Sequence, residues 1–289
     1  MYHYRFLRRS TTADECQSPA WVRQVRLVFL LSALLSVLGA LILAYTLDRA
    51  QSHALPRTLT PHVTPLLARH STALPQHPAG AATFNGPLFH GNPQVPEIAL
   101  TFDDGPQPSS TPQILTILQR SGIQATFFCI GQQVQAYPTL VRQEQATGNL
   151  VEDHTWSHPN LTLLSTPALD QQVALTARAI LRLTGTPAAF LRPPYGAINA
   201  SVLARASRLH LSIVLWNVDP RDWSLPGSAT IVARVLSATH NGSIILLHDG
   251  GGNRAQTIAA LPGIIRALRA RGLRFVTIRQ LIDDLPPAL

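Results

Sequence analysis

The chain of 289 residues contains no lysine and only two cysteines, and charged residues make up 13% of it. Cys16 and Cys129 lie on opposite sides of a long apolar segment, so the fold does not depend on a disulfide between them. Every basic side chain is an arginine, but a GC-rich genome gives the same bias and no function follows from it. Because hydrophobic residues reach 46%, the chain can build a core of ordinary size.

The formal net charge of +8 could indicate a nucleic-acid partner. Proteins that bind nucleic acid through charge gather their basic residues in runs or patches, commonly with aromatic residues between them. In this chain the arginines are scattered, and no such run occurs. The sequence therefore argues against nucleic acid as a partner.

Residues 27–47 carry no charge and consist mainly of leucine, alanine and valine. A helix of this length spans about 30 Å, the thickness of the hydrocarbon core of a bilayer. Five arginines precede the segment, which predicts that residues 1–26 are cytoplasmic and that the rest of the chain lies outside the cell. A cleaved signal peptide, which would release a secreted protein, is the alternative; its apolar region is usually shorter and ends at a small-x-small site.

Residues 48–94 are rich in proline, histidine, threonine and alanine and show little hydrophobic periodicity. Such a composition buries too little apolar surface to fold alone, so we predict a flexible linker. The globular domain is predicted at residues 95–289.

Within this domain, short apolar runs alternate with amphipathic stretches. Strands are predicted at Glu97–Phe102, Ala125–Ile130, Asn149–Asp153, Ala188–Leu191, Ser212–Val218, Ser243–Leu247 and Arg274–Ile278. Helices are predicted at Thr111–Ser121, Gln132–Thr147, Thr166–Thr184, Ala200–Leu209, Ala229–Ala238 and Gln256–Arg271. This alternation indicates an α/β fold with a parallel sheet, either open or closed into a barrel. The residues with reactive side chains mostly follow the strands, whose carboxyl ends share one face in a barrel.

Two aspartates and two histidines form the most informative pattern. Asp103 and Asp104 directly follow the first predicted strand, and His154 and His158 follow the third. Histidines at i and i+4 lie on one face of a helical turn, so both imidazoles are expected to face one metal ion. One aspartate completes a two-His-one-carboxylate set, which leaves coordination positions open for water and substrate. The second aspartate can then take a proton from that water, which indicates a hydrolase.

Five segments, taken in order, are similar to the motifs of one known family. They are TFDDGPQP at 101–108, HTWSHPNL at 154–161, RPPYG at 192–196, DPRDW at 219–223 and LLHD at 246–249. They resemble the five motifs of the polysaccharide deacetylases, the NodB-homology or carbohydrate esterase family four, over about residues 95–285. The resemblance implies a distorted (β/α)7 barrel, here preceded by the transmembrane helix and the linker.

The resemblance also assigns the main chemical roles. It makes Asp104, His154 and His158 the ligands of a divalent metal, usually Zn²⁺ and sometimes Co²⁺ or another ion. Asp103 would be the general base, and His248 the general acid that protonates the departing sugar amine.

Supporting roles follow for two charged residues in these motifs. Arg192 would pair with the catalytic Asp103, the alternative being a surface ion pair worth about 0–1 kcal/mol. Asp222 would keep His248 charged and oriented. For His248 itself, the alternative to the acid role is a strand-end histidine that is hydrogen-bonded to a loop.

Three further residues would surround the acetyl group. In the family, the backbone N–H of the residue matching Tyr195 stabilises the oxyanion. Trp223 and Leu246 correspond to the walls of the pocket that accepts the acetate methyl, although either could belong to the core.

One departure from the family concerns Glu152 and Asp153, which stand where Gly-Asn usually precedes the first histidine. Two extra carboxylates near the metal are expected to tighten its binding electrostatically or to disturb the approach of substrate.

The leading hypothesis is a membrane-anchored deacetylase that acts on a carbohydrate polymer outside the cell. Peptidoglycan is the first expected substrate, because the anchor holds the domain close to the wall, and chitin-type oligomers come next. An acetyl-xylan esterase is an alternative, since the same attack cleaves esters. A non-catalytic carbohydrate-binding module is the rival from another class, but such a module would be expected to lose Asp103, a metal ligand or His248, and all are present.

Overall fold

The computed structural model describes residues 86–285. The predicted cytoplasmic segment 1–26, the predicted anchor 27–47 and most of the predicted linker lie outside the described residues. Between residues 86 and 285, no helix is both long and apolar enough to span a membrane.

Seven strands form one sheet in which every pairing between named strands is parallel. The strands are β1 (Glu97–Asp103), β2 (Thr126–Cys129), β3 (Leu150–Asp153), β4 (Phe190–Leu191), β5 (Ser212–Ile213), β6 (Ile244–His248) and β7 (Arg274–Phe275). Their order is β5-β4-β3-β2-β1-β6, and β7 pairs with the start of β1. All seven residues of β1 are buried, as expected for a central parallel strand covered on both faces.

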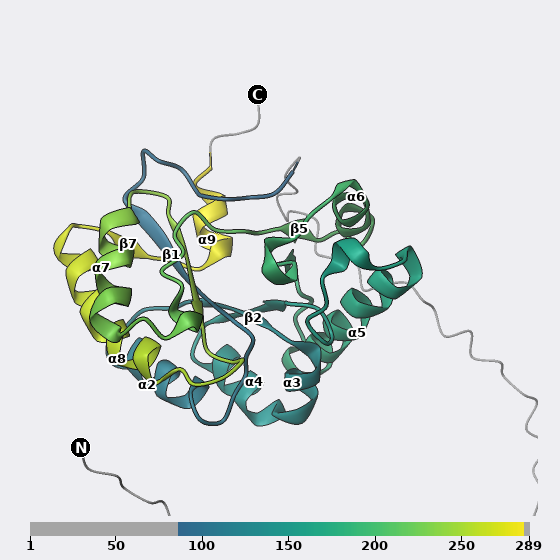
Figure 1. The fold of residues 1–289 in the computed structure, drawn as a ribbon, viewed down its shortest axis with the longest axis horizontal. Coiled ribbons are helices and arrows are strands. Elements are labelled where there is room, and N and C mark those ends of the chain that lie inside the picture. The colour runs from purple at the N-terminus through teal and green to yellow at the C-terminus, as the bar shows by residue number, and fades with distance from the viewer. Residues whose placement is uncertain (1–85, 286–289) are drawn as a thin grey trace, which may run out of the picture. The chain divides into compact units, whose positions relative to one another are not determined.

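Helices follow most strands and lie outside the sheet. They are α2 (Thr111–Arg120), α3 (Gly131–Ala136), α4 (Pro138–Ala146), α5 (Thr166–Thr184), α6 (Ala200–Arg208), α7 (Ser228–Ala238), α8 (Ala255–Ala270) and α9 (Ile278–Asp283). Short 3-10 turns occur at Leu161–Leu163, Pro194–Gly196 and Asp222–Ser224. Figure 1 shows α7, α8, α2, α4, α3 and α5 following one another around the strands, so the apolar faces of these helices cover the sheet.

The sheet curls into a parallel half-barrel. Its edge strands β5 and β6 do not pair with each other within residues 86–285. Single bridges partly cover both edges, because Leu88 pairs with Val214 beyond β5 and Val218 pairs with Ile245 of β6. The prediction of an α/β fold with seven parallel strands is confirmed, whereas a barrel fully closed by strand pairing is not observed. Pairing also starts at Leu88, before the domain boundary predicted at residue 95.

The largest difference from the predicted elements is a break in the helix expected at Gln132–Thr147. The structure has two helices here, because Tyr137 precedes Pro138 and takes non-helical angles (φ −127°, ψ 57°). The proline ring disfavours helical geometry in the residue before it. A further helix that was not predicted, α9, begins with a capping box between Thr277 and Gln280. By contrast, α5 has the predicted bounds and ends at Gly185, which is left-handed (φ 69°).

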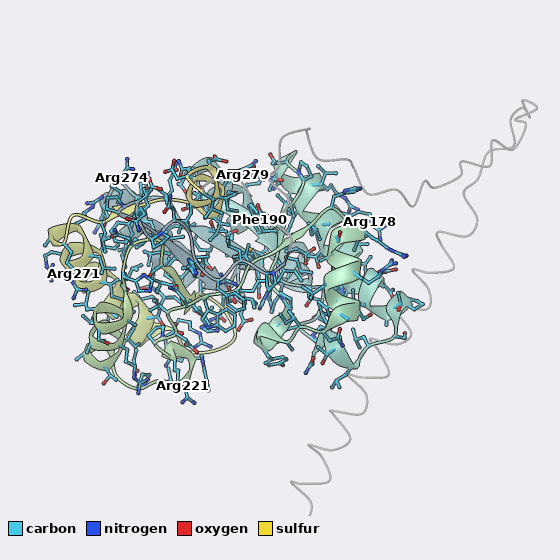
Figure 2. The ribbon with its side chains drawn as sticks, turned by 90° about the horizontal axis from the view of Figure 1, so that it is seen from above. Arg178, Phe190, Arg221, Arg271, Arg274 and Arg279 are labelled. Carbon is cyan, nitrogen blue, oxygen red and sulfur yellow. The ribbon has the colours of Figure 1, made fainter. Side chains whose placement is uncertain are left out.

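Charged side chains are distributed unevenly between the surface and the interior. Arg178, Arg221, Arg271 and Arg274 are exposed, and Figure 2 shows them at the periphery of the domain. Among the acidic residues of the described part, only Asp219, Asp283 and Asp284 are exposed. Most carboxylates are therefore inside, and several of them gather at the carboxyl ends of the strands.

Candidate active site

Strand register brings the predicted site residues to one edge of the sheet. Asp103 at the end of β1 pairs with His248 at the end of β6. On the other side, Asp153 pairs with Leu191, so that the following residues His154 and Arg192 also emerge together. The carboxyl ends of parallel strands meet at one edge, and binding sites of α/β proteins form there.

Asp104, His154 and His158 form a group that could hold a metal ion, because one ligand atom from each lies within 4.8 Å of the others. The Oδ1 atom of Asp104 lies 3.5 Å from Nε2 of His154 and 3.3 Å from Nε2 of His158. This Oδ1 is buried and has no hydrogen-bond partner. Burying a carboxylate oxygen without a partner is costly, and a cation bound between these three atoms would remove the cost. The donor set therefore fits a divalent metal, as predicted; its identity as zinc stays a prediction.

A second contact orients the first histidine. Nδ1 of His154 lies 2.7 Å from the carbonyl oxygen of Arg192. When Nδ1 donates its proton to this carbonyl, the lone pair of Nε2 faces Asp104, which is the usual arrangement of a metal-binding histidine.

The prediction that both histidines lie on one helical turn is wrong. Residues 154–160 form a loop with left-handed backbone at Thr155 (φ 68°) and His158 (φ 60°). The Thr155 N–H donates to Oδ1 of Asp153 at 2.7 Å, and the His158 N–H donates to the Thr155 hydroxyl at 3.2 Å. The imidazoles therefore converge, with ring centroids 4.9 Å apart, because side chains fix the loop and not because of helical periodicity.

The charges of this group favour a bound cation. Burial alone would raise the pKa of Asp104, but its close contact with His154 and the charges of the neighbouring histidines hold it well below its usual range. Burial alone would lower the pKa of His154, yet the charges of Asp103 and Asp104 outweigh burial and raise it. Burial and the neighbouring His154 lower the pKa of His158, which favours the neutral imidazole that a metal requires.

Asp103 lies beside the ligand group and is held by a buried arginine. Nη1 of Arg192 donates to Oδ1 of Asp103 at 2.7 Å, while Oδ2 of Asp103 lies 3.7 Å from Nε2 of His154. The guanidinium is fully buried and also donates to Thr101 and to the carbonyl oxygens of Val214 and Leu215. The alternative of a surface ion pair is therefore wrong: Arg192 fixes one oxygen of Asp103 and leaves the other toward the metal group.

His248 and Asp222 form the second part of the site. Nδ1 of His248 lies 2.7 Å from Oδ1 of Asp222, and the His248 backbone N–H donates to Oδ2 at 2.9 Å. Thr257 donates its hydroxyl to the same Oδ2 at 2.7 Å. Burial alone would lower the pKa of His248, but the hydrogen bond and charge of Asp222 raise it. The imidazole is thus kept in its protonated, donating form to higher pH.

The three residues predicted around the acetyl group lie at the same edge with different exposures. Tyr195 is left-handed (φ 62°) and 69% exposed, and its ring meets that of His158 edge-on at 4.8 Å. Trp223 follows Asp222 and is 47% exposed. Leu246 is buried and lies two residues before His248 in β6, so both side chains are on the same face of the sheet.

Glu152 and Asp153 do not act as extra carboxylates at the metal group. Oε2 of Glu152 accepts the backbone N–H groups of Ala189 and Phe190 at 2.7 and 2.8 Å. Within the described range, neither acid forms an ion pair or hydrogen bond with a candidate ligand side chain, and both are buried. The expectation that they modify metal binding or substrate approach directly is corrected: they hold backbone segments next to the site.

Sequence reasoning missed Thr257, Asp249 and Arg254. Thr257 and Arg254 lie downstream of the last motif; Thr257 bonds Asp222, and Arg254 bonds the glycines that follow Asp249. Asp249 is buried against Gly105, where an added Cβ would clash with its carboxylate. One signal was present in the sequence: three consecutive glycines follow Asp249, and such a run indicates close approach of backbone to another group.

Comparisons with known proteins agree with this geometry. A family model described as polysaccharide deacetylase matches residues 90–214. A chitooligosaccharide deacetylase of Rhizobium leguminosarum bv. trifolii is 43% identical over 194 residues, covering 63% of this chain and 90% of that protein. A peptidoglycan-N-acetylglucosamine deacetylase of Bacillus cereus is 40% identical over 207 residues, covering 71% of this chain and 94% of that protein. The solved structure of the Bc1960 peptidoglycan N-acetylglucosamine deacetylase gives a TM-score of 0.67 at 36% identity, and the match covers 68% of this chain and 92% of that one.

A curled parallel sheet with an Asp–His–His group at the carboxyl ends of its strands defines the class, an α/β protein with a candidate catalytic metal centre. Since the chain covers more than nine tenths of a relative 40% identical to it, this chain belongs to the polysaccharide deacetylase family, the NodB-like carbohydrate esterase family four. The resemblance drawn from the five motifs is confirmed.

Proposed function

We propose that this protein is a metal-dependent hydrolase that removes N-acetyl groups from an amino-sugar polysaccharide outside the cell membrane, with peptidoglycan as the first substrate and chitin oligomers as the second. The proposal depends on one observation: Oδ1 of Asp104 and two imidazole nitrogens converge beside a second aspartate that an arginine holds in place. Relatives named as deacetylases of peptidoglycan and of chitooligosaccharides support both substrates.

Asp103 is the proposed general base. A divalent ion held by Asp104, His154 and His158 would polarise the acetyl carbonyl and lower the pKa of a water molecule toward neutrality. Asp103 accepts the proton of the attacking water through Oδ2, because Oδ1 is bound to Arg192. Arg192 therefore positions the base without contacting substrate.

His248 is the proposed general acid. A sugar amine leaves poorly until it is protonated, so the reaction needs a donor near the nitrogen. The register of β1 and β6 places His248 next to Asp103, and Asp222 fixes Nδ1 so that Nε2 is the donating atom. Because Asp222 raises the pKa of His248, the acid keeps its proton to a higher pH than it would without this partner.

The acetyl group would be held by the remaining predicted residues. The backbone N–H of Tyr195 would stabilise the negative charge that develops on the carbonyl oxygen. Trp223 and Leu246 would line the pocket for the methyl group. Trp223 is half-exposed, which suits the mouth of a small apolar pocket, and Leu246 is buried, which suits its floor.

Acetate release tests the proposal directly. The purified protein is incubated with N-acetylglucosamine oligomers, peptidoglycan and O-acetylated xylan, each with and without a chelator. We expect acetate from the amino-sugar substrates, loss of release with the chelator, and recovery when Zn²⁺ is added back. Release from xylan alone would favour the esterase alternative, and binding to peptidoglycan without release would favour the carbohydrate-binding module.

The location is a separate proposal, based on residues 27–47. We expect the full chain, expressed in a bacterial host, to remain in the membrane fraction after a high-salt wash, and a variant starting at residue 48 to be released. Recovery of the full chain in the soluble fraction, shortened at its N-terminus, would favour a cleaved signal peptide and a secreted enzyme.

A further inference from the structure

The loop at residues 249–252, which follows His248, packs closely against the metal ligand Asp104. The backbone N–H groups of Asp249 and Gly250 donate to the carbonyl oxygen of Asp103 at 3.1 and 3.2 Å. A Cβ added at Gly250 would clash with the Asp104 backbone, and one at Gly251 would lie 2.6 Å from Oδ2 of Asp104. The glycines therefore let this loop form one wall of the ligand's surroundings.

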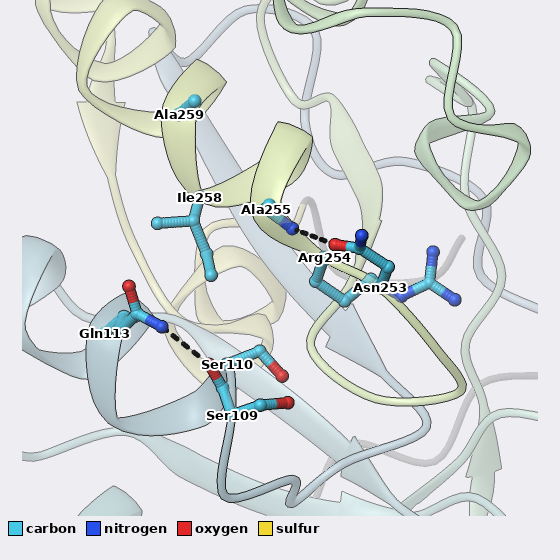
Figure 3. A pocket seen from close by; sticks show the side chains of 8 residues that line it. All are labelled: Ser109, Ser110, Gln113, Asn253, Arg254, Ala255, Ile258 and Ala259. Carbon is cyan, nitrogen blue, oxygen red and sulfur yellow. Dashed lines mark hydrogen bonds between the residues drawn. The ribbon is translucent and has the colours of Figure 1, made fainter.

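Arg254 holds this loop through two of its backbone carbonyl groups. The Nε atom of Arg254 donates to the Gly250 carbonyl at 2.6 Å, and its Nη2 atom donates to the Gly251 carbonyl at 2.9 Å. Arg254 lies just before α8, and Figure 3 shows its side chain extending away from Ser109 and Ser110, which line the neighbouring cavity. One side chain thus binds both peptide groups that contact the ligand.

The surroundings of Arg254 are unusual for a guanidinium. It is only 6% exposed, yet no carboxylate within residues 86–285 lies at ion-pair distance from it. Burying a charge without an opposite charge costs stability, so a purely structural role would be served as well by a neutral side chain. The arginine fork can bind two carbonyl oxygens at once, which a neutral amide cannot do in the same geometry.

Asp104 itself needs such support. Its backbone is left-handed (φ 74°), a conformation that a non-glycine residue keeps only where its surroundings hold it. Gln107 adds a second hydrogen bond to this loop, because its Nε2 donates to the Gly252 carbonyl at 3.0 Å. Loop and ligand are thus held against each other by groups on both sides of the contact.

We propose that Arg254 is a positioning residue of the metal centre: it fixes Gly250 and Gly251 against Asp104 and thereby keeps Oδ1 of Asp104 directed at the two histidines. This inference rests on the proposed metal site. Loss of the guanidinium would let the loop move away, allow Asp104 to leave its left-handed conformation, and weaken metal binding. Removal of groups that orient a metal ligand typically costs about 10–100-fold in metal affinity.

Zinc affinity of the apo-protein, measured by competition with a chelating dye at constant pH, tests the proposal without using activity. We expect Arg254→Gln to bind zinc about 10–100-fold more weakly, and Arg254→Lys to recover part of that loss because it keeps a charged donor. The matched control is Arg234→Gln: Arg234 also donates to a loop carbonyl, that of Pro220, but on the loop that carries Asp222. Its zinc affinity should stay within about twofold of the wild type.

The outcomes separate this inference from the proposed function. If the wild-type chain binds no zinc, the proposed function fails. If the wild type binds zinc and a folded Arg254→Gln variant binds it equally well, only the role of Arg254 fails. If Arg254→Gln does not fold, Arg254→Lys and a variant of the half-buried Gln107, Gln107→Ala, decide: unchanged zinc affinity in both would overturn the proposal, and a drop in both would support it.

Discussion

Two groups of carboxylates lie close together at the carboxyl ends of the strands, and they differ in their partners. The first group is Asp103, Asp104 and Asp222. Each lies within 4.0 Å of an arginine or histidine nitrogen. Charge on these oxygens is compensated, so they can hold a cation, accept a proton or orient an imidazole.

The second group is Glu152, Asp153 and Asp249. These carboxylates accept hydrogen bonds from backbone N–H groups or from the Thr111 hydroxyl, and none has a basic partner at ion-pair distance within residues 86–285. Burial raises the pKa of Glu152 to about 8 and that of Asp249 to about 7, and it raises that of Asp153 as well. A charged neighbour, and neither burial nor distance from the site, therefore separates a working carboxylate from a structural one.

Removal of a ligand from the first group should have the largest effect. His154→Ala is expected to leave no bound metal, because Asp104 and His158 alone provide too few donors for a catalytic site. Elemental analysis of the purified variant measures this. Glu152→Gln, two residues away in the second group, is the matched control and should keep the metal content of the wild type. Equal metal in both variants would mean that the ion is held elsewhere.

Asp103→Asn tests the base while keeping the size of the side chain. The variant should retain its metal and lose about 10²–10⁴ in kcat, because a general base contributes roughly this much. Acetate release at saturating substrate, together with metal content, measures both effects. Near-normal turnover would remove Asp103 from the role of base even if the metal is present.

Asp222→Asn should have a smaller effect that depends on pH. Because Asp222 raises the pKa of His248, the variant should lower it, and His248 should lose its proton at a lower pH. Activity that requires protonated His248 then falls earlier on the alkaline side, while the acid side is unchanged. A pH profile of kcat for both proteins measures the shift. If the alkaline limb stays in place, another group sets it and His248 is not the acid.

Much of the fold follows from sequence alone because its signals are local. The bounds of α5 were predicted correctly, since a serine precedes the helix and Gly185 can take the left-handed conformation that ends it. The reactive residues at strand ends were also found, because strand position is visible as apolar runs. Whether the sheet closes into a barrel was not determined, since its edges are bridged only by single pairs of residues far apart in the sequence, such as Leu88 with Val214.

The site was predictable as a set of residues but not as a geometry. The two histidines converge through a loop that Asp153 and Thr155 hold, an arrangement that their spacing in the sequence does not reveal. Thr257 and Arg254 were missed, because they lie in α8 and just before it and carry no motif of their own. Adjacent acidic letters such as Glu152-Asp153 and Asp103-Asp104 look alike in the sequence, and only their partners in space distinguish them.

Glu152→Gln should have the smallest effect on activity and the clearest effect on stability against pH. Its folded-state pKa, about 8, lies above the value of an unfolded glutamate, so its stabilising contribution is complete below about pH 4 and is lost as the pH rises through about 8. Glutamine keeps the acceptor for Ala189 and Phe190 but does not titrate. Between pH 6 and pH 9, the urea midpoint of unfolding should therefore fall less in the variant than in the wild type. The kcat of the variant should stay within about twofold of the wild-type value. An equal fall in both proteins would show that Glu152 is ionised in the folded domain, and the distinction between the two groups of carboxylates would not hold.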